Sequence, residues 1–224
     1  MHISVCATQS AVKNQHDRPT CVPFAVTALH EYTYDVLKGL KKAAEIDLSE
    51  EFLYYHCKQR DGLGAISTGT TMFAASASLA MDGQSLEGLC PYQLFLPKVN
   101  LVPPTDVALA DGKTRLLLGL QQLNLSLSSI RDSLRLSRPA IAVLDWYSNA
   151  YLTRLGRIEV PRPTDRFLGR HAVLIVGLEE EPQTGFCMIT FKNSWGAKWG
   201  DRGFGYFGLD YFSAYAREIW GLTS

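Results

Sequence analysis

The sequence predicts an α+β fold in which helices come first and strands follow. Apolar residues recur at helical spacing through the first half, whereas apolar runs rich in β-branched residues dominate the second half. The segment 100–113 between them is rich in Pro, Asp and Gly, which is typical of a boundary. We therefore expect a mainly helical lobe over 11–110 and a β-rich lobe over 111–224, with 1–10 as a candidate crossover into the second lobe. Two such lobes would leave a cleft between them, where ligand sites tend to lie.

Three helices are predicted in the first half of the chain. The first spans about 22–41, with Thr20 as its N-cap and Pro23 in its first turn, where no amide donor is needed. The second, over 47–59, starts with a serine cap, and the third, over 69–83, ends at a glycine. The first half is therefore expected to be mostly helical.

The second half is predicted to form an antiparallel sheet or barrel. One short helix is expected at about 127–136, before the sheet begins. Short apolar runs bounded by turn residues are typical of strands. Four such runs occur, at 140–147, 171–178, 186–193 and 203–209.

Charge and composition exclude several classes of function. Lys plus Arg and Asp plus Glu are equal at 22 each, so no overall field attracts nucleic acid or an anionic membrane. No stretch approaches the roughly 18 apolar residues of a membrane helix. The N-terminus lacks the charged start and apolar core of a secretory signal. We expect a protein of cytoplasmic origin that binds no nucleic acid, with delivery outside the cell left open.

The five cysteines indicate neither a disulfide framework nor a zinc ribbon. Their number is odd, and no CxxC pair occurs. A reducing compartment is the simpler inference, and we expect no metal and no cofactor. Most buried cysteines are small hydrophobic residues without chemistry. Cys21 differs because it lies at the predicted start of a helix, where unpaired amides and the helix dipole favour a thiolate.

A thiolate mechanism needs a base, a group that orients the base, and donors for an oxyanion. His171 opens an apolar strand directly after a turn, and Asn193 closes the next strand, so an amide oxygen could fix the imidazole. Trp195 could shield that hydrogen bond from water. Gln15 lies six residues before Cys21, close enough for a short loop to bring its amide beside the backbone N–H of the thiol residue. Taken singly, each also suits an ordinary surface, turn or core residue.

Together these residues resemble the papain-like cysteine peptidases, the family of papain and the cathepsins. The separation of 150 residues between Cys21 and His171 fits the roughly 130–150 typical of this family. The resemblance covers nearly the whole chain, in the family's order. It rests on "VKNQ" (12–15), "LSEEFLYYHC" (48–57), "GTTMFAASASLAMDG" (69–83), "CPY" (90–92), "HAVLIVG" (171–177) and "FKNSWGAKWGDRGFGYF" (191–207).

The resemblance implies a two-lobe fold with a helical left lobe, a barrel-like right lobe and the active site between them. It implies a catalytic triad in which Cys21 attacks the scissile carbonyl, His171 pairs with its thiolate and protonates the leaving amine, and Asn193 orients His171. Gln15 would help to form the oxyanion hole.

The resemblance also implies residues that contact substrate. The family's paired glycines correspond to Gly69 and Thr70, so Gly69 would keep a backbone contact with the peptide. Thr71 and Met72 fall where the family lines its main specificity pocket, although Met72 also suits the core. Trp195 completes the expected substrate-binding set.

Three positions depart from the family pattern. Arg18 stands where a structural cysteine usually precedes the nucleophile, which favours a disulfide-free branch of bacterial type. Val22 replaces a tryptophan, which removes an aromatic wall from the primed side of the cleft. Arg170 replaces Asp or Asn before the histidine, but adjacent strand side chains point to opposite faces, so we expect it to point away from the imidazole.

The predicted function is hydrolysis of peptide bonds through an acyl-enzyme, with a peptide or protein as substrate. An acyl-transferase or amidase is one alternative, because an amine can resolve the same intermediate. A non-catalytic binding module with this fold is the other. We expect either that an inhibitory propeptide was removed or that the protein is controlled by other means, and a protein inhibitor or regulator is a further candidate partner. The oligomeric state is left open.

Overall fold

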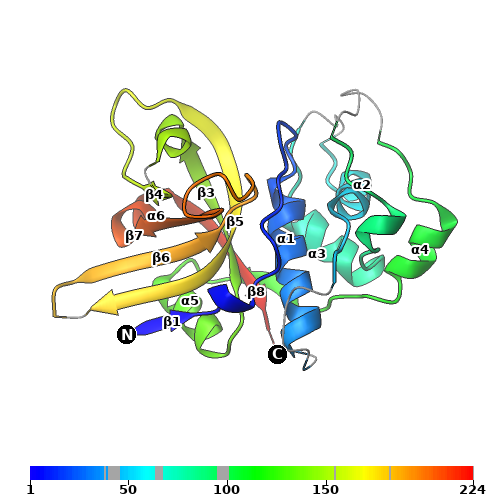
Figure 1. Cartoon of the computed structure of the whole chain (residues 1–224), viewed down its shortest axis with the longest axis horizontal. Coiled ribbons are helices and arrows are strands. Elements are labelled where there is room, and N and C mark those ends of the chain that lie inside the picture. The colour runs from blue at the N-terminus through cyan, green and yellow to red at the C-terminus, as the bar shows by residue number, and fades with distance from the viewer. Residues whose placement is uncertain are drawn as a thin grey trace. The chain divides into compact units, whose positions relative to one another are not determined.

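The computed structural model describes residues 1–37, 39, 46–63, 68–94, 101–153, 155–181 and 183–223, and excludes the side chains of 35, 37 and 152 (Figure 1). These residues form two compact units. The helical unit consists mainly of Gln15–Gln121, with Thr8–Ser10. The β unit consists of Met1–Ala7, Ala11–Asn14 and Gln122–Leu222. Among the described residues, no helix combines the length and apolar character required to cross a membrane.

Hydroxyl caps start most helices of the helical unit. The side chains of Ser49, Thr71 and Thr105 accept hydrogen bonds from the amides three residues ahead, which satisfies donors that the helix itself cannot pair. The helices of this unit are α1 (Cys21–Tyr32), α2 (Glu50–Arg60), α3 (Met72–Met81) and α4 (Asp106–Gly112), with a π-helical turn η2 (Thr33–Leu37) and a 3₁₀ turn η3 (Glu87–Leu89).

The first helix differs from its prediction at both ends. Thr20 occupies the N-cap position but its side chain makes no cap hydrogen bond, because its hydroxyl lies 2.8 Å from the hydroxyl of Tyr92. At the other end the α-helix stops at Tyr32 and continues as the π-helical turn. Part of the predicted end, at residues 38 and 40–41, lies outside the described residues.

Helix α4 lies within 100–113, the segment predicted as a boundary between the two lobes, where no helix was predicted. Thr105 caps it, and Ala108 is buried on its inner face. Gly112 lies against Phe52 of α2, where an added Cβ would come within 2.5 Å of the ring. The helix therefore forms through tertiary contacts that the local Pro and Gly content does not reveal.

The β unit contains one sheet, in which the predicted strands at 140–147, 186–193 and 203–209 form within one residue at each end. Its order is β2-β8-β3-β5-β6-β7-β4, and β1 pairs with β5. The order has two ends, so among the described strands the sheet is not closed into a barrel. The strands are β1 (His2–Ser4), β2 (Leu120–Leu123), β3 (Ala140–Tyr147), β4 (Arg157–Ile158), β5 (Phe167–Glu181), β6 (Phe186–Lys192), β7 (Phe204–Gly208) and β8 (Ala216–Leu222).

Strand β5 organises the sheet because it pairs with β3 on one side and β6 on the other, and Figure 1 shows it as a long strand beside β6. It is longer than the predicted 171–178, since paired residues extend beyond its apolar run. The register sets His171 opposite Leu144 of β3. Helices α5 (Leu127–Arg135) and α6 (Leu209–Tyr215) complete the unit, with 3₁₀ turns η1 (Cys6–Thr8) and η4 (Ser148–Leu152).

Candidate active site

Cys21 is the first residue of α1 and is half-buried. The amides of a helix N-terminus point away from the helix body and carry partial positive charge, which favours a thiolate over a thiol. Because the hydroxyl of Thr20 bonds to Tyr92, it does not compete for these amides. The structure therefore places the predicted nucleophile where the helix stabilises negative charge.

The predicted oxyanion donor lies in a tight turn before this helix. Gln15 is buried, and its Nε2 donates to the carbonyl of Arg18 at 2.8 Å. The same carbonyl accepts the amide of Thr20 at 2.8 Å. One carbonyl thus links the Gln15 amide to the residue that immediately precedes Cys21.

His171 and Asn193 form the predicted pair within the β unit. The imidazole Nε2 lies 2.7 Å from Asn193 Oδ1, and the Ser194 amide donates to the same oxygen at 2.9 Å. Both neighbours of this atom are nitrogens, one from the imidazole and one from the Ser194 amide. The atom is therefore the side-chain oxygen, because an NH₂ group at this position would face another donor, the Ser194 N–H. Nε2 therefore carries the ring proton, and Nδ1 is the basic nitrogen.

The protonation state of His171 is set mainly by burial. Its residue surface is 5% exposed, and burial lowers its pKa from 6.5 to about 4, while the hydrogen bond to Asn193 acts in the opposite direction. The predicted outward direction of Arg170 is confirmed, because its side chain is 60% exposed and lies 3.8 Å from Asp145. The imidazole is therefore neutral near pH 7 in this environment.

Aromatic rings surround the imidazole. Trp195 lies with its ring centroid 5.2 Å from that of His171, as expected of a shield for the hydrogen bond, and it also stacks on Tyr151 at 4.9 Å. Trp146 approaches the imidazole more closely, at 4.7 Å. Trp146 was not among the predicted site residues, although its place near the end of the apolar run at 140–147, before the histidine strand, was the available signal.

The predicted substrate-binding segment precedes α3 in the helical unit. A Cβ added to Gly69 would lie 3.6 Å from the carbonyl of Pro19, so this segment runs beside the turn before Cys21. Thr70 follows half-buried, and Thr71 uses its hydroxyl as the N-cap of α3. Met72 is only 2% exposed and packs as a core residue in this structure.

The other four cysteines lie in environments that suppress reactivity. All five are free thiols. Burial raises the pKa of Cys57 to about 12 and also raises the pKa values of Cys6, Cys90 and Cys187 above the usual range. These four thiols are therefore protonated near neutral pH and are weak nucleophiles.

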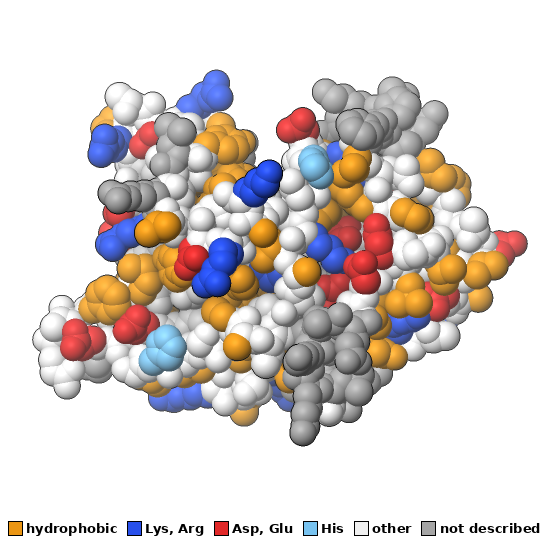
Figure 2. All heavy atoms as spheres, viewed as in Figure 1, with side chains coloured by type: hydrophobic (Ala, Val, Ile, Leu, Met, Phe, Trp, Pro, Cys, Tyr) orange, Lys and Arg blue, Asp and Glu red, His pale blue; other side chains and the backbone are white. Residues whose placement is uncertain are grey.

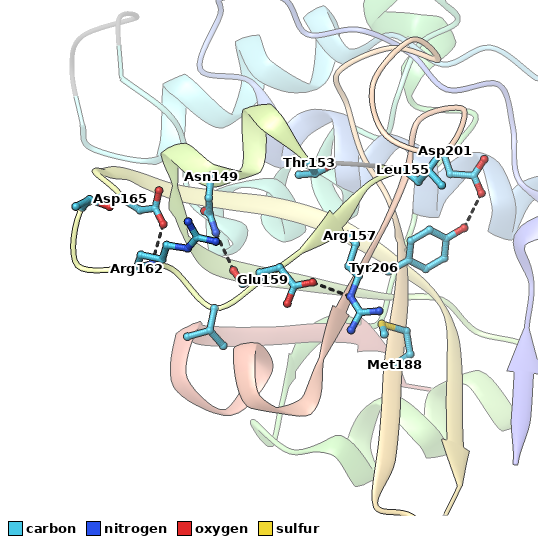
Figure 3. A pocket seen from close by; sticks show the side chains of 12 residues that line it. Asn149, Thr153, Leu155, Arg157, Glu159, Arg162, Asp165, Met188, Asp201 and Tyr206 are labelled. Carbon is cyan, nitrogen blue, oxygen red and sulfur yellow. Dashed lines mark hydrogen bonds and ion pairs between the residues drawn. The ribbon is translucent and has the colours of Figure 1, made fainter.

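A separate pocket of about 890 Å³ lies in the β unit (Figure 3). Two of its polar contacts involve charged side chains. Arg157 lies 2.8 Å from Glu159, and the hydroxyl of Tyr206 donates to Asp201 at 2.8 Å. None of the predicted site residues lines it. The face in Figure 2 likewise mixes acidic, basic and hydrophobic side chains.

Comparison with known proteins identifies the protein family to which this chain belongs. Residues 4–212 match the family model described as papain family cysteine protease, so the chain belongs to this family. A shorter match, 35% identical over 69 residues, is to the uncharacterized peptidase C1-like protein L477 of Acanthamoeba polyphaga mimivirus. It covers 31% of this chain and spans only 20% of the viral protein.

Solved structures of cysteine proteases share the fold. Xylellain, a cysteine protease from Xylella fastidiosa, has a TM-score of 0.84 at 20% identity over 100% of this chain and 85% of that one. Bromelain from Ananas comosus, solved with the E64 inhibitor, has a TM-score of 0.69 at 21% identity, and the match covers 100% of this chain and 99% of bromelain. Digestive procathepsin L 3 from Tenebrio molitor has a TM-score of 0.75 at 20% identity, and the match covers 99% of this chain and 69% of the procathepsin. The predicted papain-like α+β fold is therefore confirmed.

Proposed function

We propose that this chain hydrolyses peptide bonds, with Cys21 as nucleophile, His171 as acid and base, Asn193 as the group that orients His171, and Gln15 as an oxyanion donor. The observation that carries the proposal is the buried Nε2 to Oδ1 hydrogen bond of 2.7 Å, which leaves Nδ1 as the base. The position of Cys21 at a helix N-terminus supports it. A binding module would have little need of this combination.

In the proposed reaction, Nδ1 of His171 takes the proton from the Cys21 thiol, and the sulfur attacks the carbonyl carbon of the substrate. The carbonyl oxygen gains negative charge and binds the backbone N–H of Cys21 and the Gln15 amide. The C–N bond then breaks, and the imidazolium gives its proton to the leaving amine. Water, deprotonated by the neutral imidazole, hydrolyses the thioester and regenerates the thiol.

In the proposed mechanism, the Cys21 thiolate affects the pKa of His171. Burial, partly offset by the hydrogen bond to Asn193, lowers this pKa to about 4. A thiolate within reach of Nδ1 would raise it, because an opposite charge stabilises the protonated ring. The pKa of His171 should therefore be higher in the wild type than in Cys21→Ala.

The substrate is proposed to be a peptide or protein that contacts Gly69, Thr70 and Thr71 in the helical unit and Trp195 in the β unit. Lys58 Nζ lies 3.3 Å from the carbonyl of Gly69, which steadies this segment. Because Met72 is buried, we expect any contribution from it to be to the shape of the pocket wall. A protein inhibitor that occupies the same surface is a further proposed partner.

We propose that the protein is of cytoplasmic origin and works in a reducing compartment, because none of its five cysteines forms a disulfide. If the protein works there, its midpoint of thermal unfolding should be the same with and without a strong thiol reductant. A loss of folded protein in reductant would contradict this proposal.

The function is tested by product analysis with a mixture of peptides, using wild type and Cys21→Ala. Hydrolysis by the wild type alone, with one water added for each bond cleaved, is the expected result. An added amine distinguishes the acyl-transferase alternative, because amide products would then replace the hydrolysis products. Equal peptide binding by both proteins with no cleavage would instead indicate a binding module.

A further inference from the structure

Arg18, three residues before Cys21, forms a buried and fully oriented ion pair. Its two terminal nitrogens contact the two carboxylate oxygens of Glu51, and the NH2 to Oε1 distance is 3.0 Å. The Arg18 and Glu51 side chains are only 15% and 3% exposed. The guanidinium also lies over the rings of Tyr54 and Tyr92, 5.4 and 4.7 Å from their centroids. Bidentate pairing and stacking together allow one orientation of the guanidinium.

The ion pair joins three separate segments of the helical unit. Glu51 is the second residue of α2, and its Oε2 also accepts the amide of Gln93 at 3.2 Å. Arg18 donates to the carbonyl of Gln93 at 2.8 Å. The turn before α1, the start of α2 and the segment around Gln93 are therefore held together by charged hydrogen bonds.

The same contacts reach the proposed oxyanion donors. The carbonyl of Arg18 accepts Gln15 Nε2, as described above. The hydroxyl of Tyr92 donates to the backbone carbonyl of Gln15 at 2.8 Å and therefore accepts from Thr20 at 2.8 Å. The turn from Gln15 to Thr20 is thus held by the Gln15 side chain, by the Gln15 backbone carbonyl and by the Thr20 hydroxyl just before the helix.

We propose that Arg18, Glu51 and Tyr92 are positioning residues that hold Gln15 and the backbone amide of Cys21 where the oxyanion develops. The inference rests on the proposed peptidase function and deepens it. Arg18 stands where the family resemblance places a cysteine, so this clamp of Arg18, Glu51 and Tyr92 tethers the turn without a covalent bond.

The variants must separate positioning from stability. Arg18→Met alone leaves Glu51 as a buried, unpaired carboxylate, which destabilises a fold strongly. The double variant Arg18→Met/Glu51→Gln removes both charges, so its midpoint of thermal unfolding should return close to that of the wild type. Its kcat should still be at least about tenfold lower with little change in KM, because oxyanion contacts form in the transition state.

Coupling to Gln15 tests the route of the effect. Gln15→Ala should lower kcat by about 10²-fold, the usual effect of losing one oxyanion donor. Added to the Arg18→Met/Glu51→Gln background, it should lower kcat much less, because the donor is already misplaced. Fully multiplicative losses, or recovery of kcat along with thermal stability in the double variant, would overturn the positioning role.

Hydrogen exchange gives a readout that does not need activity. Amides of 15–24 should exchange at least about tenfold faster in the double variant than in the wild type. The matched control is Arg131→Met/Glu180→Gln, which removes a bidentate pair between α5 and β5 and should leave that segment unchanged. Unchanged exchange at 15–24 in the Arg18 variant would overturn the clamp. If the wild type cleaves no peptide but residues 15–24 still exchange faster in the double variant, the clamp is retained and the peptidase function is rejected.

Discussion

Replacing Asn193 by alanine should impair catalysis through the orientation of His171. The substitution removes the oxygen that accepts both the imidazole Nε2–H at 2.7 Å and the Ser194 amide at 2.9 Å. All three residues are buried. A buried donor left without an acceptor costs about 1–3 kcal/mol. If the loss at the imidazole is felt fully in the transition state, kcat/KM should fall by about 5- to 150-fold.

The same variant should lower the pKa of His171. Asn193 is the contact that raises this pKa against the effect of burial, so its removal should leave the ring still harder to protonate, with a pKa below about 4. Asn193→Asp is the matched control. It keeps an acceptor and adds a negative charge, so it should raise the pKa of His171.

The assay combines steady-state cleavage of a fluorogenic peptide with an NMR titration of the imidazole nitrogens. The titration is made in a Cys21→Ala background, so that no thiolate affects the ring. Circular dichroism at the assay temperature shows that each variant is folded. The reasoning is refuted if folded Asn193→Ala keeps activity within twofold of the wild type, or if its His171 pKa is unchanged or higher.

Four further predictions concern separate parts of the structure. Gln15→Ala should lower kcat by about 10²-fold with little change in KM in steady-state kinetics, and an effect on KM alone would argue against an oxyanion role. In a Cys21→Ala background, His171 should contribute a loss of about 3 kcal/mol in the free energy of unfolding as pH drops from 6.5 to about 4, because the unfolded chain binds an extra proton on this residue; in denaturant titrations, His171→Gln should remove this part of the pH dependence and keep the part from other groups such as His56 and Glu180. Brief treatment with iodoacetamide at pH 7 should leave Cys57 unmodified by peptide mass mapping, and rapid labelling would contradict its raised pKa. Gly83→Ala should destabilise the fold by at least about 2 kcal/mol in denaturant titrations, because φ is +70° and a Cβ would approach a backbone oxygen to 2.0 Å; a loss below 0.5 kcal/mol would contradict this.

The local sequence predicted elements whose apolar pattern is strong. The run at 140–147 became β3 with the same bounds, because its residues are almost continuously buried between two neighbouring strands. The bounds of such a strand depend on a local pattern of apolar residues that can be read in the sequence. The pairing of His171 with Asn193 joins residues 22 apart on different strands, and its prediction depended on the family resemblance as well as on the residue types.

Other features depend on contacts between distant residues. The clamp needs Glu51 and Tyr92 beside Arg18, and nothing in the local sequence of Arg18 indicates a buried ion pair rather than an exposed charge. Trp146 reaches the imidazole only because β3 and β5 pair in one register. Helix α4 was missed because its stability comes from packing on α2 instead of helix propensity.

The most direct test of the central claim is intact-mass analysis after reaction with an epoxysuccinyl peptide. The account predicts one adduct on the folded wild type, none on Cys21→Ala, and a much slower reaction of His171→Ala. This pattern would show that Cys21 is a nucleophile activated by His171. Labelling spread over the other cysteines, or an equal rate without His171, would contradict it.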